Sequence, residues 1–256
     1  MNSKAAELNL QNTHFVTPHG LDNDNHYTTA YELALLTDYA LNNQTFFNFV
    51  STKSYTVTIN GLPKTINNTN ELLGNLNGVY GVKTGFTNGA NRCLVTACKR
   101  DNLDIICIVL GADTKKFRTH DSIKLIEYTF KTYQMINLEQ IINNSFNEWK
   151  ARNLESISIN KGVSNKVDLK IKEFDSNLYP VKKEDINKIT TSIECDCTLE
   201  APVKQNQKIG TLNIYIDDQT VLKYDILNTN YIEKKNCFNY LQEIFSNFFK
   251  YLTINN

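Results

Sequence analysis

Three consecutive β-type segments between Gly78 and Leu110 constrain the fold of this 256-residue chain more than any other feature. The first ends in Lys-Thr-Gly, and the second and third cover residues 92–99 and 103–110. Short polar connections, such as residues 100–102, join neighbouring antiparallel strands. The third segment is nearly continuously apolar, as expected of a strand covered on both faces. We therefore predict an antiparallel meander packed between helices.

The segments around this meander predict helices. Thr29 is a suitable N-cap, and Glu32 stands at the position that completes a capping box. Apolar residues then recur at helical spacing up to residue 41: Ala30, Leu33, Leu36, Ala40 and Leu41. A second helix is predicted over residues 119–133, with one apolar stripe. With a helix at residues 2–10 and a hairpin turn at Asn60-Gly61, residues 1–137 predict a layered α/β (α+β) domain.

The pattern changes after residue 137. Short segments alternate between apolar and polar residues, and turns separate them. These segments are residues 156–159, 166–171 and 211–216. Residues 138–233 therefore predict a small all-β domain of sandwich or barrel type.

Residues 234–256 predict an amphipathic helix. Its apolar face is rich in aromatic residues: Phe238, Leu241, Phe245, Phe248, Phe249 and Leu252. Such a helix suits anchoring at a membrane surface, and it equally suits docking on its own domain or on a partner. No run of 18 apolar residues and no signal segment is present, so the chain as written is expected to stay in the cytoplasm.

Composition excludes several functions. Lysine plus arginine and aspartate plus glutamate number 27 each, which predicts no nucleic-acid partner. The six cysteines form no C-x-x-C pair and the four histidines are scattered, so we expect no metal site and no cofactor. His19 lies in a Pro-His-Gly turn, and we expect it to bind the loop backbone rather than act as a base.

The Lys83-Thr84-Gly85 triplet is the main chemical motif. The ammonium and hydroxyl groups can hold a substrate carboxylate, and glycine allows a peptide backbone to lie against the strand. Three residues alone are a weak signal, but further motifs occur in a fixed order around the triplet. They are the loop at residues 15–22 (FVTPHGLD), residues 26–30 (HYTTA), Gly111, Arg118, residues 199–203 (LEAPV) and residues 206–211 (NQKIGT).

Together these motifs resemble the low-molecular-weight penicillin-binding proteins, the serine-type D-alanyl-D-alanine carboxypeptidases. The resemblance implies a partial β-lactamase/transpeptidase-like domain, the β domain and a terminal membrane-anchor helix. It implies hydrolysis of the terminal D-Ala of peptidoglycan stem peptides through an acyl-serine, at the outer face of the cytoplasmic membrane. Its implied partners are the stem peptide, β-lactams and the membrane surface.

The resemblance also assigns site residues. Lys83 and Thr84 would engage the substrate carboxylate and support catalysis, and Gly85 would allow close approach. The backbone N–H of Phe86 would be one oxyanion-hole donor. Arg118 would add positive charge near the pocket, or else be a surface arginine at a helix start.

The family's Ser-x-x-Lys and Ser-x-Asn elements have only look-alikes here, at Ser158–Lys161 and Ser145–Asn147. The nucleophile and its lysine must share a helix face, whereas Ser158 lies in a predicted strand. We therefore expect a chain that lacks the N-terminal portion with the nucleophile and has no carboxypeptidase activity. Two alternatives stay open: a catalytically dead peptidoglycan-binding remnant, and a relative of class A β-lactamases. The β domain and the terminal helix disfavour the second.

Overall fold

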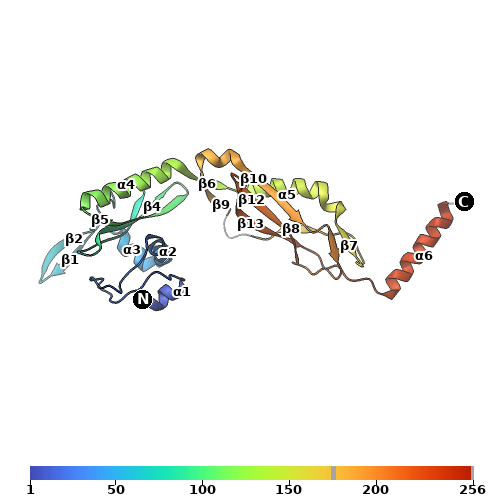
Figure 1. The fold of residues 1–256 in the computed structure, drawn as a ribbon, viewed down its shortest axis with the longest axis horizontal. Coiled ribbons are helices and arrows are strands. Elements are labelled where there is room, and N and C mark those ends of the chain that lie inside the picture. The colour runs from blue at the N-terminus through green and yellow to red at the C-terminus, as the bar shows by residue number, and fades with distance from the viewer. Residues whose placement is uncertain (174–176, 255–256) are drawn as a thin grey trace. The chain divides into compact units, whose positions relative to one another are not determined.

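The computed structural model describes residues 1–173 and 177–254, and in the last helix it describes the side chains up to residue 246 and of residue 248. The chain divides into two units, Met1–Gln134 and Met135–Asn256 (Figure 1).

A three-stranded antiparallel sheet in the order β3-β4-β5 forms the centre of the first unit. Its strands are β3 (Val79–Thr87), β4 (Asn91–Arg100) and β5 (Leu103–Ala112). The register pairs Lys83 with Val95 and Phe86 with Arg92, and β4 pairs with β5 from Arg92 to Arg100 with one register shift between Arg92 and Leu94. The predicted meander is confirmed, and β3, which carries the Lys-Thr-Gly triplet, is an edge strand.

Helices pack on both faces of this sheet (Figure 1). The helices of the unit are α1 (Asn2–Glu7), α2 (Ala30–Leu41), α3 (Gln44–Ser51) and α4 (Lys115–Thr132). On one face, Ile126 of α4 is fully buried against Leu94 and Val109. On the other face, Val95 packs with partly buried residues of α2 and α3, such as Leu33 and Phe46. Amphipathic helices that cover a sheet in this way bury its apolar side chains.

Two details differ from the sequence prediction. Thr29 caps α2 by accepting a hydrogen bond from Glu32 N, but the Glu32 carboxylate does not close the capping box. It accepts instead from the backbone N–H of Asn12 at 2.9 Å and from the Thr13 hydroxyl at 2.5 Å, which ties the N-terminal segment to α2. The second helix begins at Lys115 rather than residue 119, because the Thr114 hydroxyl caps it by accepting from Phe117 N.

The first unit also contains a hairpin of β1 (Ser54–Ile59) and β2 (Leu62–Asn67). Asn60 and Gly61 form its two-residue turn with φ values of 51° and 79°. Both values lie in the left-handed region that this type of turn requires. The predicted hairpin turn is confirmed.

The second unit is built mainly of strands, with a helix that the sequence analysis did not anticipate. This helix is α5 (Glu139–Asn153), and its buried residues Ile142 and Phe146 enter the core of the unit. A four-stranded antiparallel sheet has the order β10-β12-β13-β8, β11 pairs with β7 in parallel, and β6 pairs with β9. The bounds of these strands are β6 (Tyr133–Asn137), β7 (Ser158–Asn160), β8 (Leu169–Ile171), β9 (Leu178–Lys182), β10 (Ile189–Cys195), β11 (Thr198–Glu200), β12 (Lys208–Ile216) and β13 (Gln219–Asn228).

The last helix, α6 (Cys237–Ile254), carries exposed apolar side chains, including Phe238 at 65% and Phe245 at 60% exposure. The predicted apolar residues Phe249 and Leu252 lie outside the described side chains. Within the described part of the chain, none of the helices combines the length and the hydrophobicity needed to cross a membrane.

Candidate peptide-binding groove

The burial of β3 changes halfway along the strand. Val79, Gly81 and Val82 are buried, whereas Lys83, Gly85 and Phe86 are exposed. The exposed half borders a groove of about 1150 Å³. Side chains from the loop at residues 15–28, the loop at residues 68–71, β3, β4 and the start of α4 line this groove. Within this groove, a ligand meets β3 over residues 83–87.

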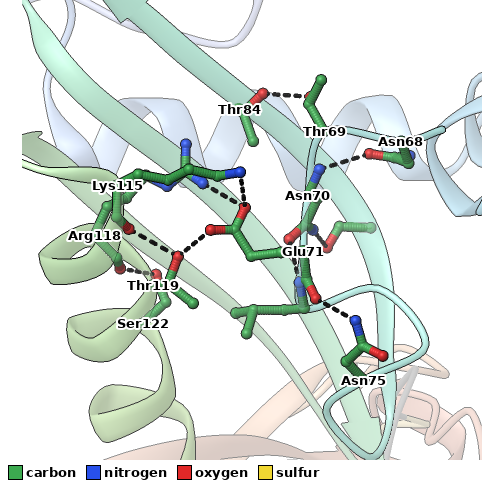
Figure 2. Close-up of polar contacts among 12 residues, drawn as sticks. Asn68, Thr69, Asn70, Glu71, Asn75, Thr84, Lys115, Arg118, Thr119 and Ser122 are labelled. Carbon is green, nitrogen blue, oxygen red and sulfur yellow. Dashed lines mark hydrogen bonds and ion pairs between the residues drawn. The ribbon is translucent and has the colours of Figure 1, made fainter.

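Lys83 and Thr84 both line the groove, as the motif predicts. The Lys83 ammonium donates to the backbone carbonyl of Thr84 at 2.5 Å, and among the described residues it forms no ion pair with a carboxylate. The Thr84 hydroxyl lies 2.6 Å from the hydroxyl of Thr69 (Figure 2). Because a carboxylate can accept from both an ammonium and a hydroxyl, this pair can hold the anionic end of a ligand.

The loop that contains Thr69 is fixed to β3 by a buried asparagine. The Asn70 amide donates to the carbonyl of Gly81 at 3.0 Å, and its oxygen accepts from Leu72 N at 3.1 Å. Asn70 is only 2% exposed, so both polar ends of its side chain need partners inside the protein. This loop holds Thr69 beside Thr84 and is one wall of the groove.

An ion pair links that loop to α4 (Figure 2). The Arg118 guanidinium donates to Glu71 at 2.6 Å, and the Thr119 hydroxyl donates to the same carboxylate at 2.5 Å. Lys115 lies 3.8 Å from it. Partial burial by itself raises the pKa of Glu71, but the Thr119 hydrogen bond and the charges of Arg118 and Lys115 hold this pKa below its ordinary value.

This ion pair changes the interpretation of Arg118. The residue is 3% exposed, so it is not the surface arginine that one reading of the sequence allowed. It lines the groove, but its charge is already engaged by Glu71, and its Nε has no hydrogen-bond partner in the described structure. Arg118 therefore holds the wall of the groove together. Glu71 carried no signal in the sequence, because the pair joins positions 47 residues apart.

Phe86 and Arg92 also line the groove. They are direct cross-strand partners, and the Arg92 Cζ lies 4.3 Å from the centroid of the Phe86 ring. Phe86 is 56% exposed. A guanidinium stacked on an aromatic face is held in place while its N–H groups stay available. The family resemblance implied a role for the backbone of Phe86, and no sequence pattern indicated Arg92.

The loop at residues 15–22 is fastened to the turn between β3 and β4. Asp22 accepts a hydrogen bond from Gly89 N at 3.1 Å, and hydrogen bonds from Thr87 and from backbone amides lower the pKa of Asp22. His19 lines the groove, and its Nδ1 accepts from Leu21 N at 3.2 Å. The predicted backbone-binding role of His19 is thus present in the structure.

The two serine look-alikes lie in the second unit and have other partners. The Ser158 hydroxyl, in β7, donates to the Thr198 hydroxyl at 3.3 Å, while Lys161 pairs with Glu200 at 3.6 Å. The Ser145 hydroxyl lies 2.7 Å from that of Thr191. Within the described residues, no cluster of histidine, cysteine or acidic side chains could hold a metal ion.

Two family models match separate parts of the chain. Residues 1–114 match the family model of D-alanyl-D-alanine carboxypeptidases, and residues 149–234 match the C-terminal domain of penicillin-binding protein 5. The chain is 28% identical to the D-alanyl-D-alanine carboxypeptidase DacF of Bacillus subtilis over 252 residues, which are 98% of this chain and 62% of the relative. It is 28% identical to DacA of Escherichia coli over 255 residues, 97% of this chain and 60% of the relative.

Solved structures show the same fold. Penicillin-binding protein 5 of Haemophilus influenzae superposes with a TM-score of 0.69 at 24% identity, over 91% of this chain and 64% of that structure. Penicillin-binding protein 6B of Escherichia coli superposes with a TM-score of 0.61 at 26% identity, over 88% and 57%. The chain belongs to the low-molecular-weight penicillin-binding proteins, the serine-type D-alanyl-D-alanine carboxypeptidase family. It spans about three fifths of the length of the curated relatives it matches.

Proposed function

We propose that this chain supplies the substrate-binding groove of a D-alanyl-D-alanine carboxypeptidase of peptidoglycan remodelling. The observation that carries the proposal is the placement of Lys83-Thr84-Gly85. The triplet occupies the exposed half of an edge strand, inside a groove, with a lysine that has no carboxylate partner among the described residues. The ligand is the C-terminal D-Ala-D-Ala of a stem peptide, and a β-lactam would occupy the same place.

Each residue of the triplet has a chemical task in this proposal. Lys83 and Thr84 hold the terminal carboxylate of the peptide through charge-assisted hydrogen bonds. The Thr69 hydroxyl forms a hydrogen bond with the Thr84 hydroxyl and so limits rotation of the Thr84 side chain. Gly85 has no side chain to keep the peptide backbone away from the strand, and the Phe86 N–H faces the carbonyl that is attacked.

Bond cleavage further requires a serine nucleophile and a base to activate it. The Ser-x-x-Lys look-alike in this sequence is spread over β7 and the turn after it, with both side chains bound elsewhere. We therefore propose that the 256-residue chain by itself binds D-Ala-D-Ala peptides without hydrolysing them. Binding without hydrolysis also fits a peptidoglycan-binding function.

A titration of the full chain with N-acetyl-D-Ala-D-Ala, followed by amide NMR, tests this proposal. We expect shifts at residues 83–87, and loss of binding in Lys83→Ala. Lys99→Ala is the matched control, since Lys99 is an exposed lysine on β4 that does not line the groove. Equal binding by Lys83→Ala and the parent chain would contradict the proposal, and a stable penicilloyl adduct detected by mass spectrometry would contradict the absence of turnover.

We also propose that α6 binds the membrane surface and that the chain acts at the outer face of the cytoplasmic membrane. The support is the set of exposed apolar side chains on this helix, such as Phe238 and Phe245. Exposed aromatic side chains on an amphipathic helix favour the interface between lipid headgroups and acyl chains.

A further inference from the structure

The two edges of the β3-β4-β5 sheet differ in how they are covered. At β3, the loop at residues 68–71 lies against the strand, and the Asn70 amide donates to the carbonyl of Gly81 at 3.0 Å. In the described part of the chain, β5 pairs with β4 only, and no other backbone hydrogen bond reaches residues 103–112. Alternate residues of an antiparallel edge strand direct their N–H and C=O groups outward. The outer side of β5 is therefore a row of unpaired donors and acceptors.

The sequence of β5 lacks the residues that usually protect such an edge. Natural edge strands often carry lysine or proline, because an unprotected edge can pair with another strand. Strand β5 contains neither, and residues 105–110 (IICIVL) are all apolar. Helices cover its faces: Val109 is buried with Ile126 of α4, and Ile106 packs on the opposite face with Val95. What β5 leaves open is therefore its backbone edge.

The helix beside this edge also leaves apolar side chains open. Ile126 of α4 faces the sheet, and Thr119 is turned toward the loop at β3, where its hydroxyl donates to Glu71. With about 3.6 residues per helical turn, Leu125 and Tyr128 lie on the opposite flank of α4, on the side of β5. Their side chains are 48% and 59% exposed. An unpaired strand edge and an apolar helix flank thus lie next to each other.

We propose that β5 is a dimerisation edge, to which β5 of a second copy of this chain adds as an antiparallel strand. A two-fold axis perpendicular to the sheet would join the two three-stranded sheets into one continuous sheet. This axis keeps both α4 helices on the same face of the joined sheet and antiparallel to each other. The flanks that carry Leu125 and Tyr128 then face one another across the axis.

The chemistry of the edge fits a second copy. A strand edge is self-complementary in the antiparallel sense, because each outward N–H of one copy meets a C=O of the other. Residues 105–112 carry no charge, so pairing this span with itself brings no like charges together. Two exposed residues of α4, Asp121 and Lys124, have opposite charges, and antiparallel copies of the helix can set one against the other. A stable dimer buries roughly 800 Å² per partner, so the apolar flank of α4 is a necessary part of this interface.

Analytical ultracentrifugation of the full chain between about 1 and 100 μM tests the dimer. We expect a monomer–dimer equilibrium. Leu125→Lys places a charge in the apolar contact and should raise the dissociation constant at least about tenfold. Phe49→Lys is the matched control and should retain the dimer, since Phe49 is 75% exposed on α3, which packs beside β3. Equal melting temperatures of Leu125→Lys and the parent chain, at a concentration where both are monomeric, show that the variant is folded.

Hydrogen exchange shows whether the strand edge itself is used. In the monomer, the outward amides of β5 should exchange faster than the amides paired with β4, in alternation along the strand. In the dimer, the outward amides should become protected as concentration rises, and Leu125→Lys should reverse this protection.

Three results would overturn the proposal. The first is a monomer at every concentration. The second is a dimer in which the outward β5 amides stay unprotected. The third is association that Phe245→Lys abolishes and Leu125→Lys leaves intact, because this would assign the contact to the apolar face of α6.

Discussion

Replacement of Glu71 by glutamine should destabilise the first unit far more than a typical surface charge does. The substitution removes the carboxylate but keeps the size, so Arg118 remains buried without its counter-charge. Removal of one partner from a fully buried ion pair costs about 3–5 kcal/mol. The Arg118 side chain is 4% exposed but that of Glu71 is 30% exposed, so water relieves part of the loss. We expect a cost of about 2 kcal/mol for Glu71→Gln.

Hydrogen exchange of the α4 amides measures this cost directly. About 1.4 kcal/mol corresponds to a factor of ten, so protection in α4 should fall about 30-fold. Trp149 is the only tryptophan in the sequence and belongs to the second unit, so its fluorescence melt should stay unchanged. Glu7→Gln is the matched control: Glu7 is 63% exposed in its pair with Lys4, and its loss should cost less than about 0.5 kcal/mol.

The same carboxylate sets a pH dependence. Because the folded-state pKa of Glu71 lies below its ordinary value of 4.5, its stabilising contribution is complete above pH 4.5 and is lost as pH falls through the folded-state pKa. Glu71→Gln should lack this acid-dependent step. If α4 protection in Glu71→Gln matches that of Glu7→Gln at neutral pH, the assignment of Arg118 as a wall-forming residue is wrong.

Three other predictions test separate parts of the account. Gly78 has a φ of +81°, and a Cβ there would meet a backbone oxygen of β4 at 2.3 Å, so Gly78→Ala should destabilise β3 by about 1–3 kcal/mol, measured by exchange of the β3 amides. Hydrogen bonds from Thr87 and nearby amides lower the pKa of Asp22, so Asp22→Asn should loosen the loop at residues 15–22 at neutral pH. Amide hydrogen exchange in this loop should become equal in Asp22→Asn and the parent chain only below the folded-state pKa of Asp22. Phe245→Glu should reduce cosedimentation with anionic lipid vesicles about tenfold, whereas Gln242→Glu on the polar face should have a smaller effect; equal effects would contradict insertion of the apolar face.

Local signals predicted the elements that position the site. The turn at Asn60-Gly61 and the Thr29 cap follow from backbone preferences of a few neighbouring residues, and both are present as expected. The Lys-Thr-Gly strand was recognisable from its flanking motifs, and the strands on either side of residues 100–102 pair as a meander. These features depend on contacts close in sequence, which a sequence pattern records.

The remaining features depend on contacts between distant segments. Glu71 meets Arg118 across 47 residues, and nothing in either local sequence indicates the pair. Arg92 reaches the groove because the hairpin register sets it opposite Phe86, and a shift of one residue would turn it to the other face. Helix α5 did carry a signal: Ile142, Phe146 and Trp149 have helical spacing, but the polar residues between them concealed it.

A crystal structure of the full chain with bound N-acetyl-D-Ala-D-Ala is the most direct test of the central claim. The account predicts the terminal carboxylate within hydrogen-bonding distance of the Lys83 ammonium and the Thr84 hydroxyl. It also predicts that the peptide backbone lies along residues 85–87 of β3, and that the Glu71–Arg118 pair is retained. A peptide bound elsewhere on the chain, or one with its carboxylate on Arg118 in place of Glu71, would contradict it.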